Sequence, residues 1–292
     1  MSTATQTVRD SFNFNIEKFP LSGPDGMQTP WYGLFRSDNG EVVGEGSVTS
    51  RYVPHQTDDV IALVEAAESV FDESVSVRTH FRDGHFVTLE PSRDYRKAIF
   101  GTSDNIFPRL FIRGCFDRKA FSASLGYYRD ICKNLSIMRS VTETTQNIRH
   151  TSGLRSKMNE LIGQFQTLKE SWQTLGSLVE RMQNVNVNLA EFLNSVYGEP
   201  EQEDGRGVTI HRNRTEKIFQ RLSSERLRSG RPQLGSDWMV SAWEAYNAVQ
   251  GFVQHDSTRR NGTSEYDRVV LALNSEPVRV AERLAVEAVS AA

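Results

Sequence analysis

The sequence predicts an α+β fold: an antiparallel sheet of hairpins with packed helices, followed by a long helix and a helical C-terminal region. Asn-Gly and Asp-Gly turns between strand-like segments predict the hairpins, because both dipeptides accept a positive φ at little cost. A heptad pattern of apolar residues predicts the long helix. With 292 residues, 38% of them hydrophobic, the chain is long enough to bury a core.

We expect five segments along the chain. They are a flexible N-terminal arm (1–28), an antiparallel sheet with helices (29–140), a long amphipathic helix (141–197), an acidic loop with a basic segment (198–234) and C-terminal helices (235–292). The arm mixes small polar residues with Phe12, Phe14 and Phe19, which can dock it on the body or on a neighbouring subunit.

Two hairpins open the sheet. Trp31–Arg36 and Val42–Val48 flank the turn at Asn39-Gly40, and Val75–Phe81 and His85–Leu89 flank the turn at Asp83-Gly84. Alternation along the second hairpin places Arg78, His80 and Arg82 on one face of a strand.

Further elements follow from spacing and composition. Helical spacing predicts a helix over Asp58–Phe71, with Thr57 or Asp58 as its N-cap. Leu110–Arg113 and Ala120–Leu125 suggest a third strand pair, after which Tyr127–Met138 has the spacing of a helix. The resulting order of hairpins and helices is typical of an antiparallel sheet covered on one face.

A heptad seam continues for about four heptads and predicts one long helix over 152–197. Such a narrow stripe faces either an antiparallel helix of the same chain or a second subunit. The seam residues are Leu154, Met158, Leu161, Phe165, Leu168, Trp172, Leu175, Val179 and Met182.

After an acidic loop, the charge reverses over His211–Arg231, where Ile218, Phe219 and Leu222 supply a short apolar face. Ser236 or Asp237 can cap the next helix, which is expected to run through Trp238 and Trp243 to about Gln254. Glu276–Ala288 reads as a last helix with Pro277 in its first turn.

Composition limits the function classes. The net charge of -3 gives no global attraction to nucleic acid or anionic membrane, so an anion-binding surface must be local. Cys115 and Cys132 are expected to stay reduced inside a cell. No run of residues is long and apolar enough for a membrane span, and the first ten residues lack a signal-peptide core, so we expect a cytoplasmic protein. We find no phosphate-binding loop, dinucleotide loop, zinc motif or catalytic constellation, and we expect no cofactor, no metal and no enzyme activity.

Clustered arginines are the main functional indication, because a guanidinium binds phosphate through a planar fork of donors. On a helix, Arg214, Lys217, Arg221 and Arg228 share one broad face. The ordinary alternatives are a solvated helix face and a helix cap with surface charges. The candidate nucleic-acid-binding residues are Arg78, Arg82, Arg149, His150, Arg155, Arg212, Arg214, Lys217, Arg221, Arg226, Arg228, Arg259 and Arg260.

Two further groups have both a functional and a structural interpretation. Tyr52, Tyr95, Tyr127 and Tyr128 can stack bases, although aromatic residues of strands more often belong to a core. The segment Trp243–Arg260 carries an apolar stripe beside a polar row. Its residues Asn247 and His255 either bond to backbone in the interior or, for His255 with Arg259 and Arg260, complete an anion site.

The chain resembles a phage and plasmid protein family known as domain of unknown function 932, over roughly Arg51 to Ala288. The resemblance rests on Arg51-Tyr52-x-Pro54, on the Ile112–Leu135 block with Arg129, Cys132 and Asn134, on Ile148-Arg149-His150-Thr151, and on Trp243-x-x-Tyr246-Asn247-Ala248 with His255. The stretch near Arg113-Gly114-Cys115 departs from the family pattern. The element order also faintly resembles that of Rad52-like single-strand annealing proteins, a likeness at the level of the fold only.

The family context implies DNA replication, recombination or takeover of a host. We therefore expect a phage-type single-stranded DNA-binding and annealing protein that is non-catalytic and homo-oligomeric, in the cytoplasm of a bacterial host and in contact with replication or recombination proteins. One alternative is a protein-binding factor that uses the heptad face to sequester or redirect a host protein. A metal-dependent nuclease with an unrecognised site is the other.

Overall fold

The computed structural model describes residues 2–44, 46–71, 75–81, 84–91, 95–116, 120–132, 134–136, 146–199, 206–257, 268, 271 and 274–292. The chain forms two compact units. Unit 1 comprises Met1–Tyr95, Pro108–Leu125 and Thr142–Ser171, and unit 2 comprises Arg96–Phe107, Gly126–Val141 and Trp172–Ala292. Each unit therefore draws on three separate stretches of sequence, which differs from the consecutive segments expected.

An antiparallel sheet confirms the predicted α+β class. Its strands follow the order β10-β8-β7-β5-β4, with β6 on β7 and β9 on β8. Strands β5 and β7 are buried along nearly their whole length, as expected of central strands. The bounds are β4 Ser76–Phe81, β5 Gly84–Glu90, β6 Lys97–Ala98, β7 Asn105–Cys115, β8 Phe121–Arg129, β9 Leu135–Ser136 and β10 Gln146–Ile148.

The second predicted hairpin is confirmed as β4–β5, with Phe81 opposite His85. Gly84 opens β5 with a φ of 153°. A Cβ added at Gly84 would lie 1.8 Å from the carbonyl oxygen of Gly114 in β7. Only glycine allows the two backbones to approach so closely, so Gly84 serves both the turn and the packing of β5 on β7.

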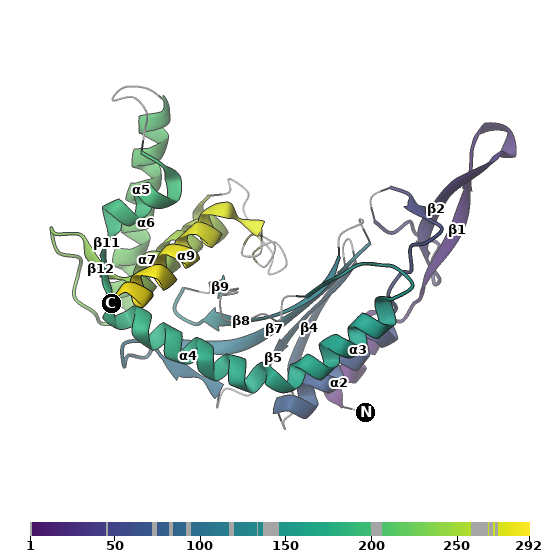
Figure 1. Cartoon of the computed structure of the whole chain (residues 1–292), viewed down its shortest axis with the longest axis horizontal. Helices are drawn as coiled ribbons and strands as arrows, with labels where there is room; N and C mark the ends of the chain where they lie inside the picture. Colours follow the sequence, from purple (N-terminus) through teal and green to yellow (C-terminus); the bar gives the residue numbers. More distant parts are fainter. Residues whose placement is uncertain are drawn as a thin grey trace. The chain divides into compact units, whose positions relative to one another are not determined.

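Helices cover one face of this sheet in unit 1, where α2 (Thr57–Phe71) contacts β5 and α3 (Leu154–Gln164) contacts α2 and β10 (Figure 1). The apolar positions predicted for α2 are buried, which confirms that helix. The expectation of a loosely ordered arm over 1–28 was wrong. Instead, α1 (Thr3–Ser11) is capped by Ser2 and contacts α2 and β4.

The first strand of the first predicted hairpin pairs mainly with an earlier segment, and not with the strand that follows it. β2 (Gln28–Arg36) pairs mainly with β1 (Ile16–Ser22), and only briefly with Val42 and with β3 (Val48–Thr49). The polar composition of residues 1–28 concealed β1. In Figure 1 the β1–β2 hairpin extends away from the rest of unit 1.

The heptad seam is buried inside the chain, but it does not form one continuous helix. α3 is followed by a 3-10 turn, η3 (Phe165–Thr167), and by α4 (Leu168–Asn184), which ends well before residue 197. Every seam residue whose side chain the structure describes is buried, which supports an intrachain partner rather than a subunit face. These are Leu154, Met158, Leu161, Phe165, Trp172, Leu175, Val179 and Met182.

Two further predictions, both in unit 2, were wrong. Tyr127–Met138 is not a helix, because β8 continues to Arg129 with Tyr127 buried, and Met138 lies outside the described residues. Ser236 and Asp237 cap no helix, because strand β12 (Met239–Ser241) follows them and Ser241 forms the capping box.

Other helices of unit 2 pack against α7, all of whose residues are buried. α7 contacts α9, α6 and α5, and it continues into a π-helical turn, η4. The last helix, predicted from Pro277, is confirmed as α9. The bounds are β11 Asn186–Asn188, α5 Leu189–Tyr197, α6 Arg206–Arg228, α7 Ala242–Gly251, η4 Phe252–Asp256 and α9 Glu276–Ala291.

Candidate functional site

The basic helix α6 turns one face into unit 2. Ile218 and Leu222 are buried, and Glu225 is buried one turn further along. Spacings of four and three residues place these positions on one side of the helix. The basic residues occupy the remaining sides, and the structure separates them into groups with different partners.

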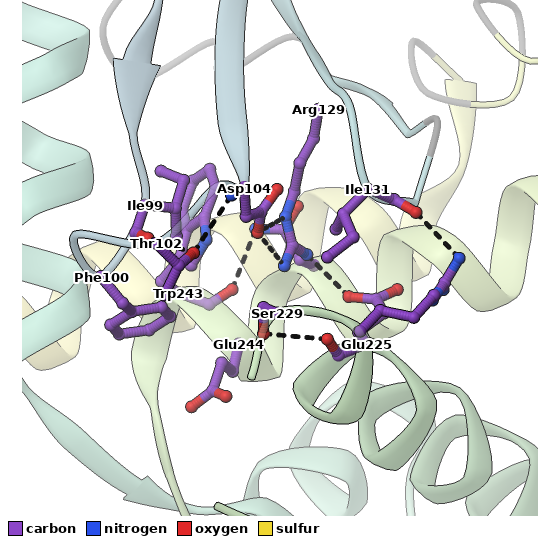
Figure 2. Close-up of polar contacts among 12 residues, drawn as sticks. Ile99, Phe100, Thr102, Asp104, Arg129, Ile131, Glu225, Ser229, Trp243 and Glu244 are labelled. Carbon is purple, nitrogen blue, oxygen red and sulfur yellow. Dashed lines mark hydrogen bonds and ion pairs between the residues drawn. The ribbon is translucent and has the colours of Figure 1, made fainter. Parts of the chain in front are cut away.

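A buried ion-pair cluster anchors α6. The guanidinium of Arg129 donates from Nε and Nη2 to Oδ2 of Asp104, at 2.8 and 2.6 Å, and from Nη1 to Oε2 of Glu225 at 2.7 Å. Figure 2 shows Arg129 between these two carboxylates. All three side chains are at most 5% exposed. Arg221 approaches Glu225 at 3.8 Å and supplies a second positive charge.

A thiol lies beside this cluster. Burial raises the pKa of Cys132 to about 12, and the nearby carboxylate of Glu225 acts in the same direction. Cys132 is therefore a neutral thiol near pH 7, and its nucleophilic reactivity is suppressed because the thiolate is the reactive form.

A second ion-pair group holds the C-terminal end of α6. Glu244 of α7 accepts from Nε and Nη2 of Arg226, at 2.7 and 2.9 Å, and from Nη1 of Arg231. Burial raises the pKa of Glu244, but the hydrogen bonds and charges of Arg226 and Arg231 outweigh it and keep the pKa below its usual value. The side chain of Arg226 is 11% exposed. Arg226, a candidate for binding DNA, is thus a structural residue.

An open pocket lies beside α6 and is the best candidate site. It encloses about 570 Å³, and its walls come from α6 and from the π-helical turn η4. Lys217, Arg221 and Arg228 line it together with His255 and Asp256. The three cations are among the four that helical spacing placed on one face, and His255 comes from the segment with the polar row. We call this site the cationic pocket.

The partners of the three cations differ. Arg221 donates from Nε to Asp256 at 2.7 Å, which neutralises most of its charge. Arg228 donates from Nη1 to the carbonyl oxygen of Ile131, a neutral partner, and keeps its charge. Lys217 is exposed and has no ion pair among the described residues. The pocket therefore carries a net positive charge from Lys217 and Arg228, while Arg221 is held by its ion pair with Asp256.

The polar row of Trp243–Arg260 divides between interior and pocket. Asn247 is fully buried, donates to the carbonyl oxygen of Trp243 at 3.0 Å and accepts through its backbone from Asn134 at 3.2 Å. His255 instead lines the cationic pocket. A π-helical turn widens the helix at this point, a feature that recurs at functional sites. Arg259 and Arg260 lie outside the described residues.

Two basic residues of α6 lie away from the cationic pocket. The guanidinium of Arg214 stacks over the ring of Tyr197, 4.2 Å from its centroid. Arg212 is exposed and lines a different pocket. Four residues were predicted to share one face of α6. Lys217, Arg221 and Arg228 line the cationic pocket, and Arg214 does not.

The remaining candidates belong to unit 1. Arg78 in β4, Arg149 after β10 and Arg155 in α3 are all exposed. His150 is 6% exposed, stacks on Tyr52 and lies 3.2 Å from the carbonyl oxygen of Val53 through Nδ1. The buried ring of His150 offers little surface for the contact with DNA that the sequence suggested. Arg82 lies outside the described residues.

Two of the four tyrosines expected to stack bases are buried. Tyr52 and Tyr127 are buried, at 9% and 0% exposed, and Tyr95 donates its hydroxyl proton to the carbonyl oxygen of Phe71. The core interpretation holds for Tyr52 and Tyr127.

A family model described as "Domain of unknown function (DUF932)" matches residues 45–273. The chain belongs to the DUF932 family. No curated protein and no solved structure matched it. The faint resemblance to Rad52-like proteins gains no support from these comparisons.

The DUF932 match covers the cationic pocket, the Arg129 cluster and α7. It begins after β2 and ends before α9, so the β1–β2 hairpin and the last helix lie outside the matched DUF932 region. The pocket is thus built from the part of the chain that defines the family.

Sequence reasoning missed a buried histidine cluster in unit 1. His55 and His85 are 0% and 1% exposed, and their rings contact each other and, through His55, His150. The three residues are far apart in the sequence, so no spacing indicated the cluster. Among the described residues, no group of three or more His, Cys, Asp or Glu side chains has an arrangement that could hold a metal ion. The described helices are also too short or too polar to cross a membrane.

Proposed function

We propose that the protein binds single-stranded DNA and promotes annealing, with the cationic pocket holding neighbouring backbone phosphates. The observation that carries the proposal is the convergence of Lys217, Arg221 and Arg228 with His255 around one open cavity. Ammonium and guanidinium groups are the usual protein partners of phosphate, and an exposed lysine beside an oriented arginine suits a flexible strand.

The geometry also limits the strength of such binding. Arg226 and Arg231 are bound to Glu244, and Arg221 is bound to Asp256, so few cations of α6 remain for phosphates. A footprint of about three phosphates gives a slope of log K against log salt near -2 for a single strand. Binding should then weaken about 20-fold between 50 and 200 mM salt.

Annealing needs no catalytic residues. Base pairing of complementary strands is favourable by itself, so a protein that holds two strands needs no cofactor or nucleotide hydrolysis. The resemblance to phage and plasmid proteins agrees with this role and with a bacterial cytoplasm as its location.

Fluorescence anisotropy of labelled single-stranded and double-stranded oligonucleotides, measured over a range of salt concentrations, tests the proposal. We expect tighter binding of the single strand and a shallow salt dependence. Absence of binding at low salt would contradict it, because phosphate contacts are strongest there.

The proposal includes self-association. Among the described residues, the β1–β2 hairpin carries a group of exposed apolar side chains that can form a subunit contact. Phe19 and Trp31 in its strands are 49% and 44% exposed, and Met27 in its connection is 72% exposed. The heptad seam is buried and cannot serve as the subunit face. Light scattering should show an assembly that Phe19→Ser with Trp31→Ser converts to a monomer. A monomeric unmodified protein would remove this part of the proposal.

The two alternative functions have less support. A protein-binding factor was expected to use the heptad face, which is buried. A metal-dependent nuclease lacks a candidate ligand group within the described ranges.

A further inference from the structure

A second pocket lies on another side of α6 in unit 2. It encloses about 460 Å³, within the range of small-molecule sites. α5 contributes Asn194, α6 contributes His211, Arg212 and Phe219, and Trp238 comes from the chain before β12. The cationic pocket uses residues further along the same helix, so α6 lines both cavities.

Two aromatic rings form one wall of this second pocket. The ring centroids of Phe219 and Trp238 are 5.1 Å apart, with an angle of 44° between the ring planes. Both side chains are partly exposed. Because the rings are tilted and accessible, a flat ligand can stack on a ring face.

The backbone of Trp238 is held in an unfavourable conformation. Its φ of 57° lies in the left-handed region, which bulky residues rarely adopt. The carbonyl oxygen of Trp238 accepts from the N–H of Leu189 at 2.9 Å, which fixes this position. Such strain is concentrated at binding sites, where it fixes the direction of a side chain.

Polar groups complete the pocket. Nε2 of His211 is buried and has no hydrogen-bond partner among the described residues. Arg212 is exposed and forms no ion pair with the described part of the chain. Glu216 also lines the pocket and can accept a hydrogen bond. A matching ligand is therefore flat and largely apolar, with a hydrogen-bonding edge for His211 or Glu216 and an anionic group within reach of Arg212.

We infer that the pocket of Phe219 and Trp238 binds a nucleobase. The inference rests on the proposed function, and it adds that the protein holds a base of the strand as well as its phosphates. In this arrangement the ring of the base stacks on Trp238 or Phe219, its polar edge meets His211, and a neighbouring phosphate lies near Arg212.

The experiment compares a short single-stranded oligonucleotide with an abasic strand of the same length and charge. The unmodified protein should bind the abasic strand about tenfold more weakly, since stacking contributes strongly for each base. Trp238→Gly and Phe219→Leu should bind the two strands within about a factor of two of each other. Glycine accepts the positive φ at position 238, so this variant removes the ring and relieves the backbone.

Ile210→Ala is the matched control, because Ile210 is an exposed apolar residue of α6 that does not line the pocket. It should keep the tenfold preference, and circular dichroism verifies that each variant is folded. The inference is overturned if the unmodified protein binds the intact and abasic strands equally. It is also overturned if both Trp238→Gly and Phe219→Leu still prefer the intact strand. Neither result contradicts DNA binding itself.

If no oligonucleotide binds, binding of free nucleosides tests the base pocket separately from the proposed function. Quenching of tryptophan fluorescence by adenosine or thymidine, lost in Trp238→Gly, would keep the base pocket and remove the proposed function. No quenching in that case would overturn both.

Discussion

Nε2 of His55 and Nδ1 of His85 lie 2.8 Å apart, in a hydrogen bond between two buried histidines. The hydroxyl of Thr57 donates to the carbonyl oxygen of Phe12 at 2.9 Å, so it accepts from Nε2 of His85 at 3.4 Å. His85 is then neutral with its proton on Nε2, and His55 donates to Nδ1 of His85. Burial lowers the pKa of His85 to about 3, and burial together with the other histidines lowers the pKa of His55 well below its usual value.

We predict that acid destabilises the protein through these two histidines. Both pKa values are lower in the folded than in the unfolded chain, so below about pH 6.5 the unfolded chain binds protons that the folded protein does not. Stability is therefore intact above that pH and falls by about 1.4 kcal/mol per pH unit for each histidine, or about 4 kcal/mol in total by pH 5.

Urea unfolding at pH 7 and pH 5 measures this loss. His85→Gln should remove about half of the pH dependence, whereas His80→Gln, at an exposed position of β4, should leave it unchanged. Equal stability at the two pH values would show that the pair is not kept neutral by the fold.

Gly114 provides a second prediction, because its Cα lies against the ring of His55. An added Cβ would be 2.2 Å from Nε2 of His55. Gly114→Ala should destabilise the fold by about 1–3 kcal/mol or more through overpacking. Gly163 in α3 is exposed and has no atom within 4 Å of the same added atom. Gly163→Ala should therefore stabilise the protein by about 0.5–1 kcal/mol. Thermal unfolding compares the two variants, and equal melting temperatures would contradict the predicted contact.

The buried cluster predicts a large effect at Arg129. Arg129→Met leaves the carboxylates of Asp104 and Glu225 buried without their partner and should cost about 3–5 kcal/mol of unfolding free energy. Arg279 pairs with Glu276 at the surface, and Arg279→Ala should cost less than about 1 kcal/mol. Chemical denaturation of both variants provides the comparison. A small loss at Arg129 would show that the cluster is hydrated.

Lys217 and Arg228 provide the prediction for DNA binding. Replacing both with alanine should weaken binding at low salt and reduce the salt slope by about 1.4, the contribution of two single-strand phosphate contacts. Arg221 is left in place, because its ion pairs with Asp256 and Glu225 support the fold. The control is Arg283→Ala on an exposed side of α9, which should keep the original slope. An unchanged slope in the double variant would assign both residues to a solvated surface.

Local patterns predicted the elements that depend on local chemistry. The Asp83-Gly84 turn specified β4–β5, and the apolar spacing of Val60, Val64 and Phe71 specified α2. The Tyr127–Met138 segment failed because Tyr127 is buried by strand pairing, and helical spacing cannot be distinguished from a buried strand over so few residues.

The candidate site was predictable only in part. Helical spacing grouped Lys217, Arg221 and Arg228, since one helix determines their relation. The same reasoning could not reveal that Arg226 is bound to Glu244 or that His150 joins His55, because those partners are distant in sequence. Charge counts treat every arginine alike, whereas only tertiary structure shows which of them are already compensated.

The Arg129 cluster has a consequence for the order in which the nascent chain can fold. Arg129 leaves the ribosome 25 positions after Asp104, but Glu225 is 96 positions behind Arg129. At ordinary translation rates that separation lasts about 5–20 s. During this interval the Arg129 guanidinium has only one of its two carboxylates, and β8 cannot yet bury its polar end against α6. Completion of this part of unit 2 therefore waits for the last quarter of the chain to be synthesised.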